Sequence, residues 1–245
     1  MKVDLNCDLG EGIGNDALLI PLISSANIAC GFHAGDRDIM QQTIEACLQQ
    51  GVAIGAHPSW PDREHFGRKE MELPAAALYD CMMEQLHTLE SIARAMGTSL
   101  HHVKPHGALY NQSARDAGIA STIARAVKDF DPGLILYGLS NSLSLTIATE
   151  LGLRTAHEVF ADRTYQEDGS LTPRSRPDAL IEDAALAAEQ ALRMVREQKV
   201  LTTSGHTVQV QADTICLHGD GAHALAFCKS IHFILQHHNI RIEQI

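Results

Sequence analysis

Strict alternation of apolar and polar side chains predicts the first strand of this protein, in the stretch VDLNCDLGEG at residues 3–12. The apolar positions are Val3, Leu5, Cys7 and Leu9, and the polar positions between them are Asp4, Asn6 and Asp8. A period of two is typical of a strand with one apolar and one polar face. Such strands usually turn their polar face to water, so the surroundings of this one decide where its polar side chains point.

Short strand-like runs alternate with helical patterns along the rest of the chain. The runs lie at 3–8, 26–33, 52–57, 101–106, 133–138, 155–162 and 213–218. Helical patterns lie at 38–51, 73–97, 113–129, 141–151, 177–197 and 221–237. A shorter candidate, NDALLIPLI, follows the first strand and is interrupted by Pro21, and we expect Pro177 to begin the helix at 177–197.

Repeated strand–helix units predict a parallel sheet, either open and doubly wound or closed into a barrel. About seven units in 245 residues, close to the roughly 250 residues typical of a (β/α) barrel, favour closure. We find no linker or change of composition and expect one domain over 1–245. A small hairpin at 199–212, turning at Ser204-Gly205, and a short final strand in NIRIEQI complete the prediction.

A closed barrel explains the polar face of the first strand. Outward side chains of such a barrel pack on helices and must be apolar, whereas the inward side chains face the lumen. We therefore expect Asp4, Asn6 and Asp8 to point inward, with Asp8 nearest the C-terminal mouth, where barrels of this kind carry their active sites.

Ionisable side chains end six of the predicted strands. They are Asp8, His33, His57, His106, Asp162 and His218. Any single one is most simply a hydrogen-bonded structural residue, but burying six together is costly unless they pair, bind a metal or face a ligand. We therefore predict a shared polar pocket.

Two histidines have a carboxylate close by in the sequence, His33 with Asp36 and His218 with Asp220. Such pairs could hold Zn²⁺ or another divalent ion, with His33, His57, His218 and Asp220 as the candidate ligands. A hydrogen-bonded network without metal is an equal alternative.

Lys104, on the inward register of its strand, could stabilise an oxyanion or a phosphate. The alternative is a buried partner for Asp4, Asp8 or Glu158.

Three carboxylates, Asp8, Glu11 and Asp162, could act as general bases toward water. Arg163 could clamp a substrate carboxylate or brace a loop through Glu158 or Asp168.

Composition narrows the class of protein. A formal net charge of −11 argues against nucleic acid or an anionic membrane as partner, and no apolar run approaches the roughly 20 residues of a membrane span. Six scattered cysteines without a CxxC pair and no leader-like N-terminus favour a cytoplasmic protein with reduced thiols. Neither GxxxxGK[ST] nor GxSxG occurs, so no standard P-loop or acyl-enzyme serine is indicated.

Six motifs identify a family resemblance over nearly the whole chain. They are DLNCDLGEG, NIACGFHAGD, GAHPSWPD with FGRK, HVKPHGALYN, EVFADRTYQEDGSLTPR and ICLHGDGAHA. In this order they resemble the family of the 5-oxoprolinase A subunits, also called the LamB/YcsF or lactam-utilisation family. The resemblance implies a distorted seven-stranded, TIM-like (β/α) barrel of the glycoside hydrolase/deacetylase type.

The resemblance also implies an activity: ATP-dependent opening of the cyclic amide of 5-oxo-L-proline to L-glutamate, with ADP and phosphate released. It implies ATP with Mg²⁺ as cofactor and two partner subunits, B and C, while association of several copies of this chain stays open. For this reaction we predict Asp8, Glu11, Lys104, His106 and Asp162 of the shared pocket as catalytic residues. We predict His33, Asp36, His57, Arg163, His218 and Asp220 as substrate-binding residues.

Two alternatives stay open at this point. The histidine-rich strand ends would also suit a stand-alone, metal-dependent hydrolase or deacetylase acting on an amide or a sugar. The missing P-loop would suit a non-catalytic subunit that binds the substrate or holds its partners. A related lactam is also open as the substrate.

Overall fold

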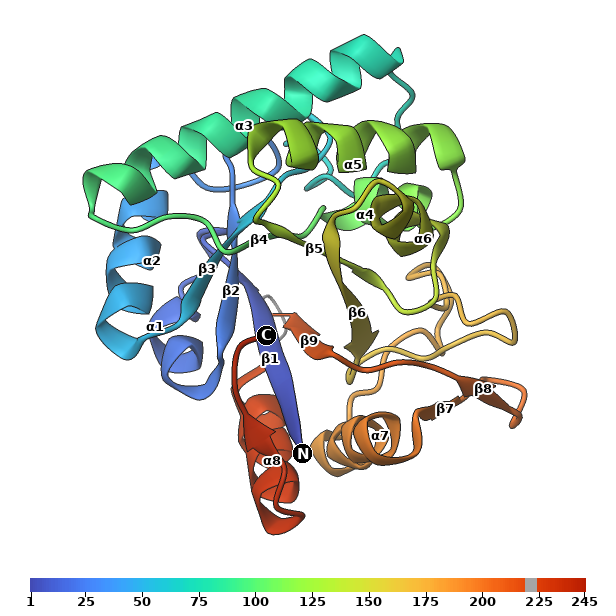
Figure 1. Cartoon of the computed structure of the whole chain (residues 1–245). Helices are drawn as coiled ribbons and strands as arrows, with labels where there is room; N and C mark the ends of the chain where they lie inside the picture. Colours follow the sequence, from blue (N-terminus) through green and yellow to red (C-terminus); the bar gives the residue numbers. More distant parts are fainter. Residues whose placement is uncertain (219–223) are drawn as a thin grey trace.

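A closed parallel β-barrel forms the centre of the protein in the computed structural model, which describes residues 1–218 and 224–245 (Figure 1). Its strands are β1 (Lys2–Leu9), β2 (Ser25–Ala29), β3 (Ala53–His57), β4 (His102–Val103), β5 (Ile135–Leu139), β6 (Arg154–Phe160) and β9 (Thr214–His218). They neighbour one another in this order, and β9 pairs with β1 to close the ring. The predicted seven-stranded (β/α) barrel is therefore confirmed, and the open sheet is excluded.

Helices surround the barrel (Figure 1). The longer ones are α2 (Arg37–Gln50), α3 (Ala75–Ala95), α5 (Ala117–Phe130), α6 (Leu143–Glu150), α7 (Ala184–Glu197) and α8 (Ala224–His237). The shorter ones are α1 (Asp16–Leu19), the 3-10 turn η1 (Ile20–Leu22) and α4 (Gly107–Ser113). Beneath them the outward side chains of β1, from Val3 to Leu9, are at most 2% exposed and join the main hydrophobic core, as the alternation predicts.

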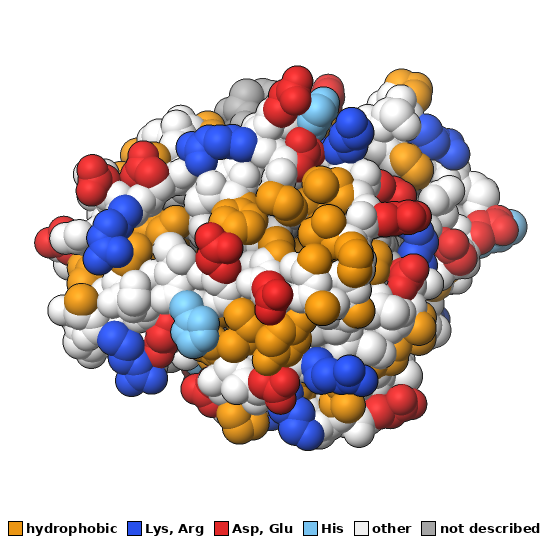
Figure 2. Space-filling model, turned by 90° about the horizontal axis from the view of Figure 1, so that it is seen from above, with side chains coloured by type: hydrophobic (Ala, Val, Ile, Leu, Met, Phe, Trp, Pro, Cys, Tyr) orange, Lys and Arg blue, Asp and Glu red, His pale blue; other side chains and the backbone are white. Residues whose placement is uncertain are grey.

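The outer face of α3 and α5 has a mixed surface. Hydrophobic side chains gather at its centre among single acidic side chains (Figure 2). Between the two helices, the Tyr79 hydroxyl donates to Asp129, and the His87 ring meets Phe130 edge-on. Contacts of both kinds therefore join α3 to α5.

Two small elements at the C-terminal part of the chain agree with prediction. β7 (Lys199–Leu201) and β8 (Thr207–Gln209) form an antiparallel hairpin, and β10 (Arg241–Ile242) pairs in parallel with β1. All six cysteines are buried free thiols. Among the residues that the structure describes, no helix has both the length and the apolar character to cross a membrane.

Two predicted strands are shorter than expected. β2 stops at Ala29 because Gly31 and Gly35, with φ of 92° and 74°, turn the chain, so His33 lies beyond the strand. β4 has only two residues. Lys104 and His106 continue to donate backbone hydrogen bonds to β3 and the segment after it, but Pro105 between them has no N–H to offer.

Two predicted helices have wrong boundaries. α7 begins at Ala184 rather than at Pro177, because the Asp183 carboxylate caps it by accepting hydrogen bonds from the Ala185 and Leu186 amides. The predicted helix at 113–129 is preceded by a separate helix, α4, and Asp116 caps the start of α5.

Candidate functional site

The inward side chains of the barrel form a polar network, and its lowest layer centres on Asp4. Its Oδ1 accepts hydrogen bonds from the Ser24 and Ser25 hydroxyls at 2.6 and 2.7 Å. Its Oδ2 accepts from Thr214 at 2.6 Å and from Tyr137 at 3.2 Å. Burial raises the pKa of Asp4 although these hydroxyls oppose the rise. Asp4 is thus satisfied within the protein and is not a partner of Lys104.

A layer of amides lies above Asp4. The Asn6 side chain donates to Glu158 Oε1 at 2.9 Å. The Asn27 side chain donates to Asn6 Oδ1 at 2.7 Å and to Asp8 Oδ1 at 2.9 Å, and it accepts from His102 Nε2 at 2.8 Å. Because every link has one possible donor and one acceptor, the chain of hydrogen bonds fixes the position of the Asp8 carboxylate.

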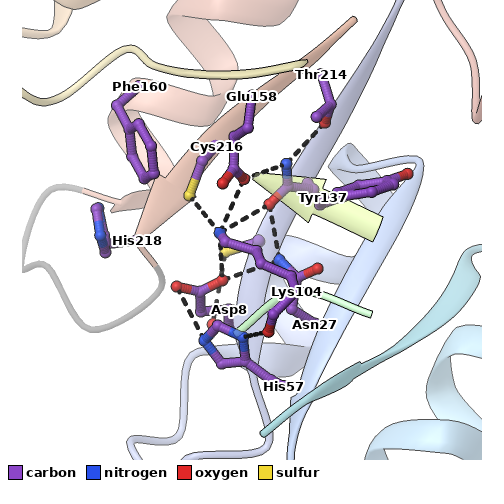
Figure 3. Close-up of polar contacts among 12 residues, drawn as sticks. Asp8, Asn27, His57, Lys104, Tyr137, Glu158, Phe160, Thr214, Cys216 and His218 are labelled. Carbon is purple, nitrogen blue, oxygen red and sulfur yellow. Dashed lines mark hydrogen bonds and ion pairs between the residues drawn. The ribbon is translucent and has the colours of Figure 1, made fainter. Parts of the chain in front are cut away.

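Lys104 occupies the centre of the next layer, with its side chain pointing into the lumen (Figure 3). Its Nζ lies 2.9 Å from Asp8 Oδ1 and 2.9 Å from Glu158 Oε1, and it also contacts Cys216 Sγ at 3.0 Å and Asn6 Oδ1 at 3.3 Å. Burial alone would lower its pKa, but the carboxylates raise it well above the ordinary value. Lys104 is therefore a charged, buried partner of Asp8 and Glu158, one of the two roles the sequence left open.

Asp8 faces both this ammonium group and a histidine. Its Oδ2 lies 3.4 Å from His57 Nε2. Burial would raise the pKa of Asp8, but His57 and Lys104 lower it to well below its usual range. The carboxylate therefore stays ionised at the mouth of the barrel.

His57 and His106 lie with one ring nitrogen of each facing the other. His57 Nδ1 donates to the Lys104 carbonyl at 2.7 Å, and His106 Nε2 donates to the Phe66 carbonyl at 2.9 Å. The remaining nitrogens, His57 Nε2 and His106 Nδ1, are 2.9 Å apart. Both imidazoles are thus anchored to the backbone on their outer sides.

His33 stacks on His106, with ring centroids 3.8 Å apart and planes 4° from parallel. Its Nε2 lies 3.4 Å from Glu11 Oε1, and His106 Nδ1 lies 3.6 Å from the same oxygen. Burial lowers the pKa of His33 to about 2, so the ring is neutral. The predicted pairing of His33 with Asp36 is wrong, because Asp36 is exposed and caps α2 by accepting from the Ile39 amide.

On the opposite side of the mouth, His218 Nδ1 lies 2.7 Å from Asp162 Oδ2, and its ring stacks on Phe160. Burial would raise the pKa of Asp162, but His218 and nearby arginines lower it. The carboxylate is therefore ionised and accepts the proton on Nδ1. The other predicted neighbour of His218, Asp220, lies outside the described residues.

Arg163 is buried beside Asp162, and burial lowers its pKa to about 10. It donates to the carbonyls of Thr172 and Ala179, at 2.6 and 3.3 Å. It therefore braces the 161–183 segment through backbone oxygens, not through the predicted carboxylates of Glu158 or Asp168.

A cleft of about 690 Å³ opens above these groups. Its lining includes seven of the residues described so far: Asp8, His57, Lys104, His106, Phe160, Arg163 and His218. The predicted residues Glu11 and His33 lie next to this set but do not line the cleft. Asp36 does not line it either, and its side chain caps α2 instead. The structure thus brings the predicted strand ends together at one mouth.

Three exposed arginines, Arg68, Arg115 and Arg174, also line the cleft. No strand-end pattern singles them out, although Arg68 lies in the FGRK motif and Arg174 ends the motif that includes SLTPR. With Lys104 and Arg163 they outnumber the carboxylates of the same lining, Asp8, Glu70 and Asp168, although Arg115 is paired with Glu70. The excess of positive charge suits anionic ligands.

Comparison with known sequences places this architecture in a family. The profile of the LamB/YcsF family matches residues 3–245. The chain belongs to the LamB/YcsF family. Within it, the chain is 52% identical over 247 residues to the A subunit of 5-oxoprolinase from Tolumonas auensis, covering 99% of this chain and 98% of that protein.

Solved structures agree with the LamB/YcsF assignment. A lactam utilization protein from Thermus thermophilus matches with a TM-score of 0.93 and 42% identity over the full length of both chains. A family 4 carbohydrate esterase from Streptomyces lividans matches with a TM-score of 0.55 and 13% identity, covering 100% of this chain and 92% of the esterase. This second likeness shows a shared barrel fold and nothing about the reaction.

Proposed function

We propose that this chain is the A subunit of an ATP-dependent 5-oxoprolinase, which opens the lactam of 5-oxo-L-proline to L-glutamate as ATP becomes ADP and phosphate. The observation that carries the proposal is the 52% identity, over nearly the whole of both chains, to a protein named as the A subunit of 5-oxoprolinase. The word subunit in that name supports a multi-subunit enzyme, and we propose subunits B and C as the partners.

Energetics explain why ATP would be required. A five-membered lactam is little strained and is stabilised by amide resonance, so water attacks it slowly and hydrolysis gains little. Transfer of the terminal phosphoryl group of ATP to the lactam oxygen gives an activated imidate. Water then adds to the same carbon, and the C–N bond breaks as the nitrogen takes up a proton, which leaves the open chain as an acyl phosphate. A second water attacks the acyl carbon, and phosphate leaves with the former lactam oxygen to give the carboxylate of glutamate.

The cleft has room and charge for such substrates. A volume of about 690 Å³ lies within the range of sites for drug-sized ligands, and 5-oxoproline alone would leave most of it empty. The arginines Arg68, Arg115, Arg163 and Arg174 would attract both the carboxylate of 5-oxoproline and the phosphates of ATP. We treat Mg²⁺ as part of the nucleotide substrate. Mg²⁺ prefers oxygen ligands, whereas the histidines that converge at the barrel mouth, His33, His57 and His106, offer nitrogen.

Protonation states refine the predicted roles. A carboxylate whose pKa is well below its usual range is a poor base, so we assign Asp8 to hold Lys104 in place near the lactam oxygen. The ionised Asp162 fixes a proton on Nδ1 of His218, which leaves Nε2 free to accept one. His218 would then be the general base toward water and Asp162 its positioning residue.

The test measures glutamate released from 5-oxoproline by this chain together with subunits B and C, with and without ATP. We expect turnover only when all three proteins and ATP are present. His218→Gln should lower kcat at least about 100-fold, the usual size of a general-base contribution. His237→Gln, at an exposed position in the last turn of α8, is the matched control and should retain the wild-type rate.

Other outcomes would redirect the assignment. Glutamate release by the isolated chain without ATP would favour a stand-alone hydrolase. Normal kcat in His218→Gln, with only KM or assembly of the complex altered, would favour a binding role without a catalytic one.

A further inference from the structure

One carboxylate and three imidazoles meet beside the floor of the cleft: Glu11, His33, His57 and His106. Each offers one donor atom, and these four atoms lie within 4.8 Å of one another. They come from four separate segments, namely the loop after β1, the turn after β2, the end of β3 and the segment after β4. Their convergence is therefore a product of the barrel and not of local sequence.

Distances within this cluster fit a single metal ion. The separations are 2.9 Å between His57 Nε2 and His106 Nδ1, 3.4 Å between His33 Nε2 and Glu11 Oε1, and 3.6 Å between His106 Nδ1 and Glu11 Oε1. In a tetrahedral site with metal–ligand bonds of about 2.0–2.1 Å, ligand atoms are about 3.4 Å apart. The three separations scatter around that value.

Backbone contacts orient two of the imidazoles as metal ligands are oriented. The N–H groups of His57 Nδ1 and His106 Nε2 donate to the carbonyls of Lys104 and Phe66. Such outer hydrogen bonds fix the tautomer and leave the other nitrogen as a lone pair facing the ion.

Without an ion, the same geometry requires an extra proton. The outer nitrogens of His57 and His106 each carry one already, so the 2.9 Å contact between the inner nitrogens needs a third. An ion would bind both lone pairs and remove the need for that proton.

His33 adds an independent observation. The residue is 1% exposed, and neither of its ring nitrogens has a hydrogen-bond partner among the described residues. Buried polar nitrogens are rarely left in this state. Because Nε2 is the nitrogen that lies toward Glu11, it is in position to bind the same ion.

A second convergent group, Asp8, Cys216 and His218, does not make a comparable site. The Lys104 ammonium lies 2.9 Å from Asp8 Oδ1 and 3.0 Å from Cys216 Sγ. A positive charge therefore already occupies the space between two of its three donors.

We propose that Glu11, His33, His57 and His106 bind one divalent transition-metal ion of the zinc class. Three imidazoles and one carboxylate suit Zn²⁺ or Co²⁺ better than Mg²⁺ or Ca²⁺, which prefer oxygen. Four protein ligands complete a tetrahedral shell, so the ion is structural and ties four segments of the barrel mouth together. The ligand set differs from the predicted one, in which Asp220 and His218 took part. The proposal does not depend on the oxoprolinase reaction.

The experiment uses the purified full chain, stripped with a chelator and then equilibrated with Zn²⁺ or Co²⁺ alone. We expect one equivalent of either ion per chain and the intense visible absorption of four-coordinate Co²⁺. At a free Zn²⁺ concentration of about 100 times Kd, Tm should rise by roughly 5–10 °C. His33→Ala and Glu11→Gln should each weaken binding at least about tenfold. His87→Gln, at an exposed position of α3 where the ring contacts Phe130 and not the cluster, should not.

Two results would overturn the proposal: no stoichiometric binding of either ion, or equal binding by Glu11→Gln, His33→Ala and the unchanged chain. Circular dichroism of each metal-free variant checks folding. If His33→Ala fails to fold, the comparison of Glu11→Gln with the unchanged chain decides the result, because glutamine keeps the size and shape of the glutamate side chain. Binding is measured without ATP, 5-oxoproline or partner subunits, so its outcome is separate from that of the proposed function.

Discussion

Replacing Lys104 by methionine tests whether the buried ammonium group holds the barrel mouth together. Methionine keeps the unbranched stem but removes the charge. The change leaves Asp8 and Glu158 buried without the cation that lies 2.9 Å from each of them. The amides of Asn27 and Asn6 still donate to these carboxylates, so hydrogen bonds remain while charge balance is lost.

Two estimates bound the cost. Removing one partner of a buried ion pair typically costs about 3–5 kcal/mol. The protein can limit this cost by protonating one carboxylate. For a glutamate with an ordinary pKa of about 4.3, that costs about 1.4 kcal/mol per pH unit, or roughly 3.7 kcal/mol at pH 7. We therefore expect a loss of about 3–4 kcal/mol at pH 7, equivalent to a Tm lower by roughly 6–16 °C for a chain of this size.

The pH dependence has a definite sign. In the unchanged protein the pKa of Asp8 is well below its usual range, so its stabilising contribution is present at neutral pH and is lost only in acid. In Lys104→Met a carboxylate takes up a proton more readily in the folded state. The loss of stability should therefore shrink by up to about 1.4 kcal/mol for each pH unit between about pH 7 and 5.

Urea titrations followed by tryptophan fluorescence can measure these differences. Trp60 is the single tryptophan, is fully buried, and donates to Gln112 at 2.7 Å, so it reports unfolding directly. Glu158→Gln is the matched control, because it leaves the Lys104–Asp8 pair balanced. A pH-independent loss below about 1 kcal/mol in Lys104→Met would refute the reasoning. So would a double variant, Lys104→Met with Glu158→Gln, whose loss equals the sum of the single losses.

Two further predictions concern the layer below Lys104. Gly55→Ala should destabilise the protein by at least about 2 kcal/mol, because a Cβ would lie 2.1 Å from His102 Nε2. At Gly138 a Cβ would lie no closer than 2.9 Å, to the end of the flexible Leu145 side chain, with Leu145 Cγ at 3.2 Å and Ser144 Oγ at 3.4 Å. Gly138→Ala should therefore cost less in the same urea titration, and equal losses would contradict the packing argument. Burial lowers the pKa of His102 well below 6.5, so the unfolded chain binds its proton first and stability should fall as pH drops below about 6.5. That fall should be less steep in His102→Gln, and an unchanged slope would show that His102 is protonated in the folded protein.

The strand register could be predicted because it depends on a local pattern. Alternation in residues 3–9 places Asp4, Asn6 and Asp8 on one face, and only a lumen can bury that face beside apolar helices. Hydroxyl, amide and ammonium partners from other strands then satisfy each of them. The strand count and the closure of the barrel follow from the same regularity.

Partners across the mouth could not be predicted, because turns beyond the strands decide them. His33 has Asp36 three residues away, yet the turn at Gly31 and Gly35 directs its ring to Glu11 and leaves Asp36 to cap α2. The sequence signal for Asp36 was the cap position itself, an aspartate directly before a helical run.

The structure of the long segment 161–183 could not be predicted either. The pattern from Pro177 onward predicts a helix, but Asp183 offers the stronger cap and the preceding residues stay irregular. Arg163 holds this segment through two carbonyl oxygens, contacts that no side-chain pattern encodes. The placement of Arg174 at the cleft follows from that arrangement and was missed with it.

The polar layers of the barrel differ in what they leave available to a ligand. The carboxylate of Asp4 has four hydroxyl partners, and the three N–H bonds of the Lys104 ammonium are shared among four acceptors. Asp4 therefore has its capacity taken up, whereas Lys104, which also lines the cleft, holds Asp8 and Glu158 and would present its charge toward a lactam oxygen. Above them, His218 and the exposed arginines line the cleft wall, where Arg115 is paired with Glu70. A substrate would thus contact groups that the barrel holds rigidly, such as Lys104, at the floor of the cleft. At the wall it would contact the side chains of Arg68, Arg115 and Arg174, which carry positive charge.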